Sequence, residues 1–233
     1  MNSSYEMSRG APVAAENADV RAAFITRTYG HLLGAILAFA LIEMYLFDSG
    51  LAVTIARGLL GTSWLLVLGG FIVVSWLASR LAHSAQSSAA QYAGLAAFVV
   101  AEAIIFVPLL FLAQSVAPGT IQSAAMVTLI GFTGLTAIVF YTRKDFSFLG
   151  NVLKWGGIVA VLLIVAGVIF GFQLGTFFSV AMIGLAGAAI LYDTSNVLRD
   201  FPADRHVAAA LQLFASVAMM FWYVLRLFLG SRD

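Results

Sequence analysis

The stretch between Lys154 and Asp193 contains no charged residue, and a carboxylate follows directly after its last apolar run, Ala188 to Tyr192. This stretch is long enough for two crossings of a lipid bilayer at roughly 20 residues each, with a short turn between them. Asp193 therefore lies inside a membrane or at its edge. An ionisable group costs roughly 2.5 to 3.5 kcal/mol at the centre of a membrane helix, so Asp193 is a candidate functional residue from its position alone.

The composition of the whole chain agrees with membrane insertion. The 233 residues are 62% hydrophobic and 10% charged, whereas soluble domains contain about 25% charged residues. We therefore expect an all-α integral membrane protein. The formal net charge is only +1, so no strong positive field favours nucleic acid as a partner. The chain has no cysteine, which excludes disulfides, thiolate metal sites and cysteine nucleophiles.

Seven apolar runs reach the length of about 17 to 25 residues that a helix needs to cross a bilayer. The predicted spans are 24-47, 63-80, 91-114, 121-141, 154-174, 176-197 and 207-229. The connections are short, so residues 23-233 form one membrane domain, and any function must reside in its helices or loops. Residues 1-22 are polar and mixed in charge, which predicts a flexible tail. A signal peptide has a basic start and an apolar run that ends in a small-residue cleavage site, whereas the first apolar run here begins near Tyr29 and continues through Phe47, so we expect an uncleaved span.

Arginine and lysine predict the orientation, because short cytoplasmic loops are enriched in them. Most of these residues would lie on one side of the membrane: Arg9, Arg21, Arg27, Arg80, Arg143, Lys144, Lys154, Arg199 and Arg205. The other side would carry Arg57, Arg226 and Arg232. The amino terminus is therefore predicted to be cytoplasmic. An odd number of full crossings would place the carboxyl terminus outside, whereas a re-entrant last segment would reverse that.

Polar residues within or beside the spans allow two interpretations each. Asp193 either reaches cytoplasmic water or pairs with a neighbouring arginine, or it is a buried acid that acts as a switch by gaining and losing a partner. Glu102, near the middle of the third span, either holds two helices together as a neutral acid or faces a water-filled cavity in a functional role. Arg80, Arg27 and His31 lie at span ends, where such side chains usually anchor a helix at the interface. Arg80 would lie at the level of Asp193 if their helices adjoin.

Enzymatic chemistry is not expected. A retinal protein needs a lysine in its last span, and this chain has none there. All three histidines lie near the predicted cytoplasmic ends and no G-x-S-x-G sequence occurs, which argues against an intramembrane serine protease. Tyr192 and Asp193 resemble half of the aspartyl protease motif, but no acid occurs from Val207 to Ser231, so no catalytic dyad forms across the last two spans. We expect no cofactor, and calcium only as a transient ligand.

Three stretches together resemble the Bax inhibitor-1 family, also called the transmembrane Bax inhibitor motif family. They run from Phe140 to Leu149, from Ile190 to Thr194, and through the last span from Ala210 to Leu227. The resemblance implies a compact bundle of seven transmembrane helices with the sixth largely central. It also implies a pH-sensitive calcium leak, suppression of cell death in eukaryotes, or, in bacteria, modulation of a membrane-bound AAA protease.

The resemblance further implies a sensor made of two aspartates, on the sixth and seventh helices, that share a proton, with an arginine of the second helix as another partner. Asp193 matches the first aspartate. Ser216 stands where the second would be, and Arg80 falls about two residues beyond the position of the arginine. Glu102 could supply the second acid only if the third helix packs against the sixth. We therefore expect Asp193 and Glu102 to line one polar path.

The resulting expectation is an ion leak for calcium or protons with Asp193 as its sensor. The alternative is a non-transporting regulator that binds a membrane protease or another membrane protein through the tail and the cytoplasmic loops. We expect a multi-pass protein of a bacterial inner membrane, with the lipid bilayer as its surroundings.

Overall fold

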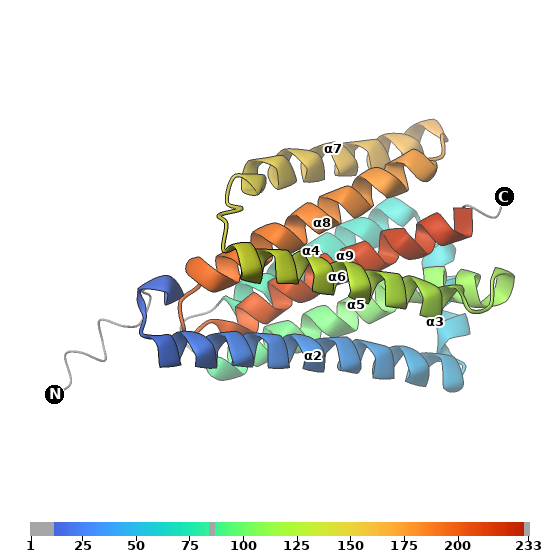
Figure 1. The fold of residues 1–233 in the computed structure, drawn as a ribbon. Helices are drawn as coiled ribbons and strands as arrows, with labels where there is room; N and C mark the ends of the chain where they lie inside the picture. The colour runs from blue at the N-terminus through green and yellow to red at the C-terminus, as the bar shows by residue number, and fades with distance from the viewer. Residues whose placement is uncertain (1–11, 84–86, 231–233) are drawn as a thin grey trace.

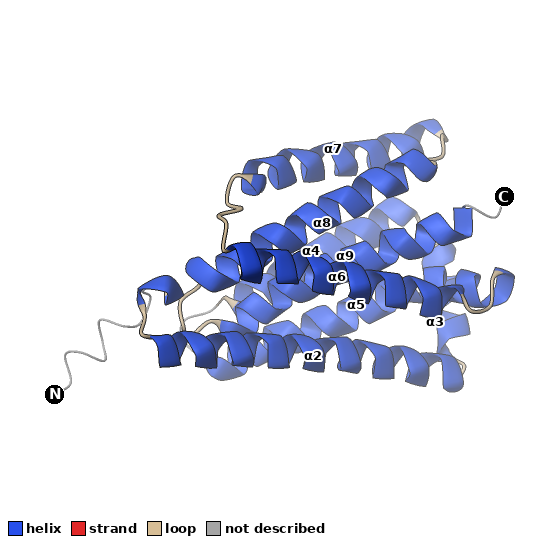
Figure 2. Ribbon diagram, viewed as in Figure 1, coloured by secondary structure: helices blue, strands red, loops and turns tan. Residues whose placement is uncertain are grey.

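The computed structural model describes residues 12–83 and 87–230, which form a helical bundle (Figures 1 and 2). No strand occurs in these residues. The elements are η1 (Val13–Ala15), α2 (Ala18–Asp48), α3 (Leu51–Leu60), α4 (Trp64–Ala82), α5 (Ser88–Val116), α6 (Thr120–Thr142), α7 (Leu149–Phe170), α8 (Thr176–Arg199) and α9 (His206–Gly230).

Seven of the described helices, α2 and α4 to α9, are long and apolar enough to cross a membrane. They match the seven predicted spans in order. Successive spans run in opposite directions, so the bundle has an N end, where α2 begins, and a C end, where α9 ends (Figure 1). Because α9 is one continuous helix from the N end to the C end, the re-entrant alternative for the last segment is wrong.

Both boundaries of α7, which was predicted over 154-174, lie earlier in the chain than expected, at Leu149 and Phe170. Lys154 was taken as the start of the helix, but it is an exposed residue inside it. The aliphatic stem of Lys154 can carry the charge toward the interface, so the helix can begin before this residue. The helix also ends earlier. Gly171 adopts a left-handed conformation with a φ of 74°, and its N–H donates to the Gly167 carbonyl at 2.9 Å, which is a common way for a helix to end.

Helix α9, the seventh span, is the centre of the bundle, and the expectation that the sixth would be largely central is wrong. The buried share of the most apolar 18-residue stretch is 72% in α9 and 33% in α8. Helices α2, α4, α5, α6 and α8 all pack against α9. Three of its alanines, Ala208, Ala209 and Ala210, are 0% exposed, because small side chains let the surrounding backbones approach closely.

Helix α7 lies at the edge of the bundle (Figure 1). Only 11% of its most apolar stretch is buried, and it packs against α8 and, less extensively, against α4. The remaining surface of α7 faces outward and carries large apolar side chains such as Leu162 and Ile169, which are 61% and 63% exposed. A helix that touches so few neighbours closes one side of the bundle only loosely.

The predicted flexible tail, residues 1-22, is wrong over its described part. Val13 is 1% exposed, and its N–H donates to the Phe201 carbonyl at 2.9 Å, which ties η1 to the loop between α8 and α9. The Asn17 side chain then caps α2 by accepting a hydrogen bond from the Val20 N–H at 2.9 Å, as asparagine commonly does before a helix. Residues 1–11 lie outside the described residues.

Candidate functional site

Asp193 is buried between α8 and α9. Its side chain is 4% exposed and lies on α8, six residues before Arg199, where that helix ends at the N end of the bundle. The Gln212 side-chain amide donates to one carboxyl oxygen at 2.6 Å, and the Ser216 hydroxyl donates to the other at 2.5 Å. We call Asp193, Gln212 and Ser216 the latch, because they join the two helices through polar side chains.

The local sequence explains how α9 supplies both donors. Gln212 and Ser216 are four residues apart, so they project from the same face of the helix, one turn apart. A short loop returns the chain from α8 to α9, so the two helices run antiparallel and side by side. Hydrogen bonds to an ionised carboxylate are roughly twice as strong as those between neutral groups, so the latch can hold a charged Asp193 without a cation.

Arg80 does not approach the latch. Its guanidinium stacks over the ring of Trp76 on the same helix, 5.3 Å from the centroid. Helix α4 packs against α3, α5, α7 and α9, and within the described residues it does not contact α8. The suggestion that Arg80 partners Asp193 is therefore wrong for this state, because the central α9 separates the two helices.

Glu102 lines a cavity of about 710 Å³ that α4, α5, α7, α8 and α9 enclose. The residue is 7% exposed, and no described residue forms a hydrogen bond with its carboxyl group. Most of the wall is apolar, with aromatic side chains such as Phe98 and Trp222. Toward the C end the wall becomes polar, because Gln173 and Arg226 line it there. The Arg226 guanidinium also donates to the Leu174 carbonyl at 3.1 Å.

The structure does not bring Asp193 and Glu102 onto one continuous path. Asp193 does not line the cavity, and α5 and α8 do not contact each other within the described chain because α9 lies between them. The cavity nevertheless reaches Ala215, which precedes Ser216 in the sequence. The expected common path is therefore interrupted in this state, and the cavity touches α9 at the residue next to Ser216 of the latch.

Glu43 is a third buried acid that the sequence analysis missed. It lies on α2, five residues before that helix ends at Asp48, and is 7% exposed. Neither carboxyl oxygen has a hydrogen-bond partner among the described residues. An isolated glutamate inside an apolar run was visible in the sequence, by the same argument that singled out Glu102. No cluster of three or more His, Asp or Glu that could hold a metal ion occurs in the described part of the chain.

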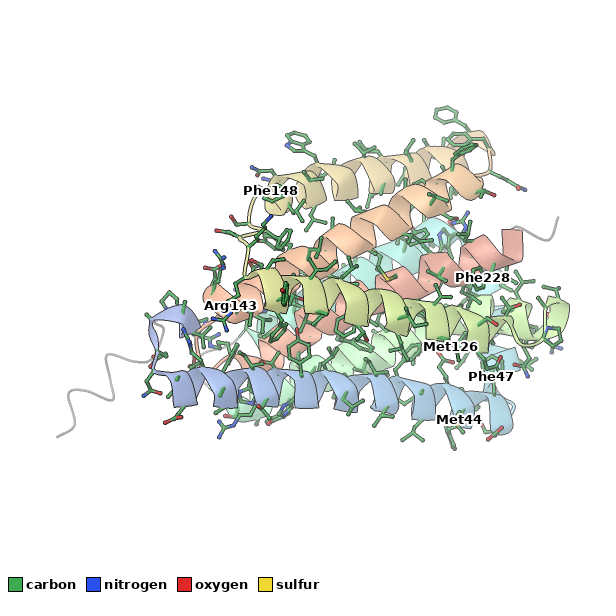
Figure 3. The ribbon with its side chains drawn as sticks, in the orientation of Figure 1. Met44, Phe47, Met126, Arg143, Phe148 and Phe228 are labelled. Atoms are coloured by element: carbon green, nitrogen blue, oxygen red, sulfur yellow. The ribbon has the colours of Figure 1, made fainter. Side chains whose placement is uncertain are left out.

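The loop between α6 and α7 is fastened to the end of α8, close to the latch. Arg199 pairs with Asp145 at 3.0 Å and donates to the Arg143 carbonyl at 2.5 Å. The Phe146 N–H donates to the Ser195 hydroxyl at 3.2 Å. Figure 3 labels Arg143 at the start of this loop. Because Ser195 lies two residues from Asp193, this loop and the latch are attached to the same turns of α8.

Asp145 is the exposed acid of this loop. The Ser147 N–H donates to its carboxyl group at 2.8 Å. This bond, together with the Ser147 side chain and the nearby Arg199 guanidinium, holds the pKa of Asp145 below its ordinary value of 3.8. The acid therefore stays ionised to lower pH than an isolated aspartate, which favours the contact with Arg199.

Comparison with known proteins extends over nearly the whole chain. A family described as inhibitor of apoptosis-promoting Bax1 matches residues 21–233. Protein LIFEGUARD 4 of Arabidopsis thaliana is 28% identical over 228 residues, which are 93% of this chain and 88% of that protein. A protein of Escherichia coli K12 named modulator of FtsH protease YccA is 32% identical over 125 residues, which are 49% of this chain and 57% of that protein. Its counterpart in Escherichia coli O6:H1, named inner membrane protein YccA, has the same identity and coverage.

Proposed function

Because the chain belongs to the Bax inhibitor-1 family, which its match over residues 21–233 establishes, we propose that it is a pH-sensitive ion leak protein in which Asp193 controls the path. Calcium or protons are the ions proposed. The protein has no catalytic role in this proposal. It lies in a bacterial inner membrane with the N end of the bundle facing the cytoplasm, as the arginine and lysine distribution favours.

The latch is the observation that carries this proposal. An ionised Asp193 accepts one hydrogen bond from Gln212 and one from Ser216, and so joins α8 to α9. Protonation removes the negative charge that strengthens both bonds and turns one carboxyl oxygen into an O–H donor. The contact between α8 and the central helix is therefore weaker when Asp193 carries a proton, which makes this pair of helices the element that pH biases.

The cavity is the part of the ion path that the latch would control. Glu102 offers a carboxyl group to an ion about halfway along α5, and Arg226 and Gln173 provide polar surface toward the C end. Ala215, the neighbour of Ser216 in the latch, lines this space, whereas the three latch residues themselves do not. A displacement of α8 from α9 would extend the cavity toward the N end, and the path would then cross the bundle.

The test is calcium entry into dye-loaded proteoliposomes from about pH 8 to pH 5. We compare the unmodified protein with Asp193→Asn and Glu102→Gln, and use Asp145→Asn as the matched control because Asp145 is an acid at the same end but outside the latch. The flux is expected to rise as the pH falls. It should lose its pH dependence in Asp193→Asn, fall at every pH in Glu102→Gln, and remain unchanged in the control. Folded protein that gives no flux above empty liposomes contradicts the proposal.

A second candidate function is regulation of a membrane-bound AAA protease without transport. The name of the Escherichia coli relative, modulator of FtsH protease, favours it, as do the exposed side chains around the α6–α7 loop, where Tyr141 is 92% and Phe148 is 63% exposed. A protease assay separates the two functions. Regulation should survive Asp193→Asn and disappear when Tyr141 and Phe148 are replaced by serine. The ion leak should lose its pH dependence in Asp193→Asn and persist when Tyr141 and Phe148 are replaced.

A further inference from the structure

A second hollow lies outside the site described above, on the outer side of the bundle between α2 and α5. It is a groove of about 550 Å³ that begins at Arg27 and Tyr92 near the N end and runs along α2 as far as Ile42. Its walls are almost entirely apolar. Neither the latch residues nor Glu102 line it, so the proposed ion path does not use this groove.

Small residues form one side of the groove and leave it open. Gly30, Gly34 and Ala38 are spaced four residues apart on one face of α2, and all three line the groove. A Cβ atom added at Gly30 or Gly34 would meet no atom within 4 Å. Small residues at this spacing normally let another apolar chain approach a membrane helix closely. Within the described residues, no segment of this chain fills that space.

A positive charge stands at the N end of the groove. The guanidinium of Arg27 has no carboxylate within salt-bridge distance among the described residues. His31, one turn along, is already engaged: one ring nitrogen is hydrogen-bonded to the Arg27 carbonyl at 2.6 Å and the other to the Tyr92 hydroxyl at 2.9 Å. Arg27 is therefore the cation of this groove that is available to bind a ligand. It lies near the predicted level of the membrane surface, where the first span was expected to begin.

A groove lined by small residues suits either a second copy of the chain or a lipid, and the charge of Arg27 distinguishes between these two occupants. A second copy packing about an axis along the membrane normal would have the same orientation, so its surface would meet the identical surface here. Arg27 would then face the partner's Arg27 one turn from the contact at Gly30, and like charges at close range repel. An anionic phospholipid avoids this conflict, since its acyl chain matches the apolar groove and its headgroup matches the arginine.

We propose that the groove between α2 and α5 binds one anionic phospholipid, with an acyl chain along Gly30, Gly34 and Ala38 and the headgroup phosphate against Arg27. The contact between headgroup and arginine supplies the preference for negative charge, and the open glycine face supplies the depth that seats the chain. The lipid would bridge α2 and α5, the two helices that line the groove.

The experiment counts lipids bound to the full-length protein by native mass spectrometry, after adding phosphatidylglycerol or phosphatidylcholine with the same acyl chains. Arg27→Gln should weaken phosphatidylglycerol binding about fivefold, as expected for one basic residue near a membrane surface, and leave phosphatidylcholine unchanged. Gly34→Leu should weaken both lipids because it fills the groove. Arg21→Gln is the matched control, since Arg21 is exposed on the same helix and does not line the groove.

Three results would overturn the proposal. Equal losses in Arg27→Gln and Arg21→Gln would mean that diffuse surface charge attracts the lipid. Unchanged lipid binding in Gly34→Leu would mean that the chain does not lie in the groove. A protein that is dimeric as purified and becomes monomeric in Gly34→Leu would assign the groove to a second copy. Calcium flux is a separate measurement, so the failure of the ion leak proposal would leave this one standing.

Discussion

Asp193 and Glu43 are both buried carboxylic acids inside predicted membrane spans, but their surroundings differ. Two donors from α9 bind the carboxyl group of Asp193, whereas no described residue donates to either oxygen of Glu43. The surroundings of Asp193 therefore support an ionised acid. Those of Glu43 tolerate only a protonated one, because an isolated charge in an apolar environment costs several kcal/mol. Burial alone thus does not define a functional acid, and the donors that surround it matter as much.

The largest expected effect is the loss of the latch. Asp193→Ala leaves the Gln212 amide and the Ser216 hydroxyl buried without their acceptor, and we expect the free energy of unfolding to fall by about 2 to 4 kcal/mol. Asp193→Asn keeps an acceptor of the same shape and should lose less than about 1 kcal/mol. Denaturant unfolding in detergent measures both changes. Equal stability of the two variants would show that the hydrogen bonds of the latch contribute little.

Glu43 should respond with the opposite sign. Glu43→Met replaces an unpartnered buried acid with an apolar side chain of similar length, and we expect a gain of about 1 to 2 kcal/mol in the same unfolding measurement. Glu43→Gln should change stability little, because the amide remains unpartnered. If Glu43→Met destabilised the protein, Glu43 would have a partner in solution and the contrast with Asp193 would disappear.

A single donor should have a smaller effect than the acid itself. Ser216→Ala removes one hydrogen bond and leaves the Gln212 bond in place, so we expect a loss of about 1 kcal/mol. The matched control is Ser115→Ala. The Ser115 hydroxyl is exposed and bonds only to carbonyls of its own helix, so its removal should change stability by less than about 0.5 kcal/mol. Equal losses at both positions would place Ser216 outside the latch.

The smallest effect is expected at the loop that fastens to α8. Because the pKa of Asp145 is lowered, its contact with Arg199 is fully present above pH 3.8 and is lost as the pH falls through the lowered value. Asp145→Asn should therefore speed amide hydrogen exchange at Phe146 and Ser147 above pH 3.8, with no measurable change in global stability. The difference between variant and unmodified protein should vanish at lower pH. If the difference in exchange rate persisted at lower pH, the substitution would act through the backbone of the loop rather than through the charge of Asp145.

The sequence predicted the seven spans well because bilayer thickness fixes the length of an apolar run, whatever packs around it. It did not predict that α9 would be central. Lipid and protein interior are both apolar, so the pattern of hydrophobic residues does not separate the two sides of a membrane helix as it does in water. The alanine content of the last span was the available signal, since small residues on every side, such as Ala209 and Ala218, indicate neighbours on every side.

The site was predictable only in part. Asp193 and Glu102 stand out as acids in apolar runs, and Ser216 was placed by resemblance. Gln212 was not singled out because its role depends on how α8 and α9 align along their length, which neither helix specifies by itself. The separation of Glu102 from Asp193 likewise depends on α9 lying between α5 and α8. Glu43 was available from the sequence alone, by the same argument as Glu102.

The central position of α9 also constrains how the protein is made, because α9 is the last of the described helices to leave the ribosome. Helices α2, α4, α5, α6 and α8 enter the membrane before their common neighbour exists, so their inner faces must contact lipid or one another until α9 follows. Asp193 likewise lacks its two hydrogen-bond donors, Gln212 and Ser216, until α9 is in place. Assembly of the bundle therefore has to wait for α9, and a chain without α9 would lack the helix around which the others pack.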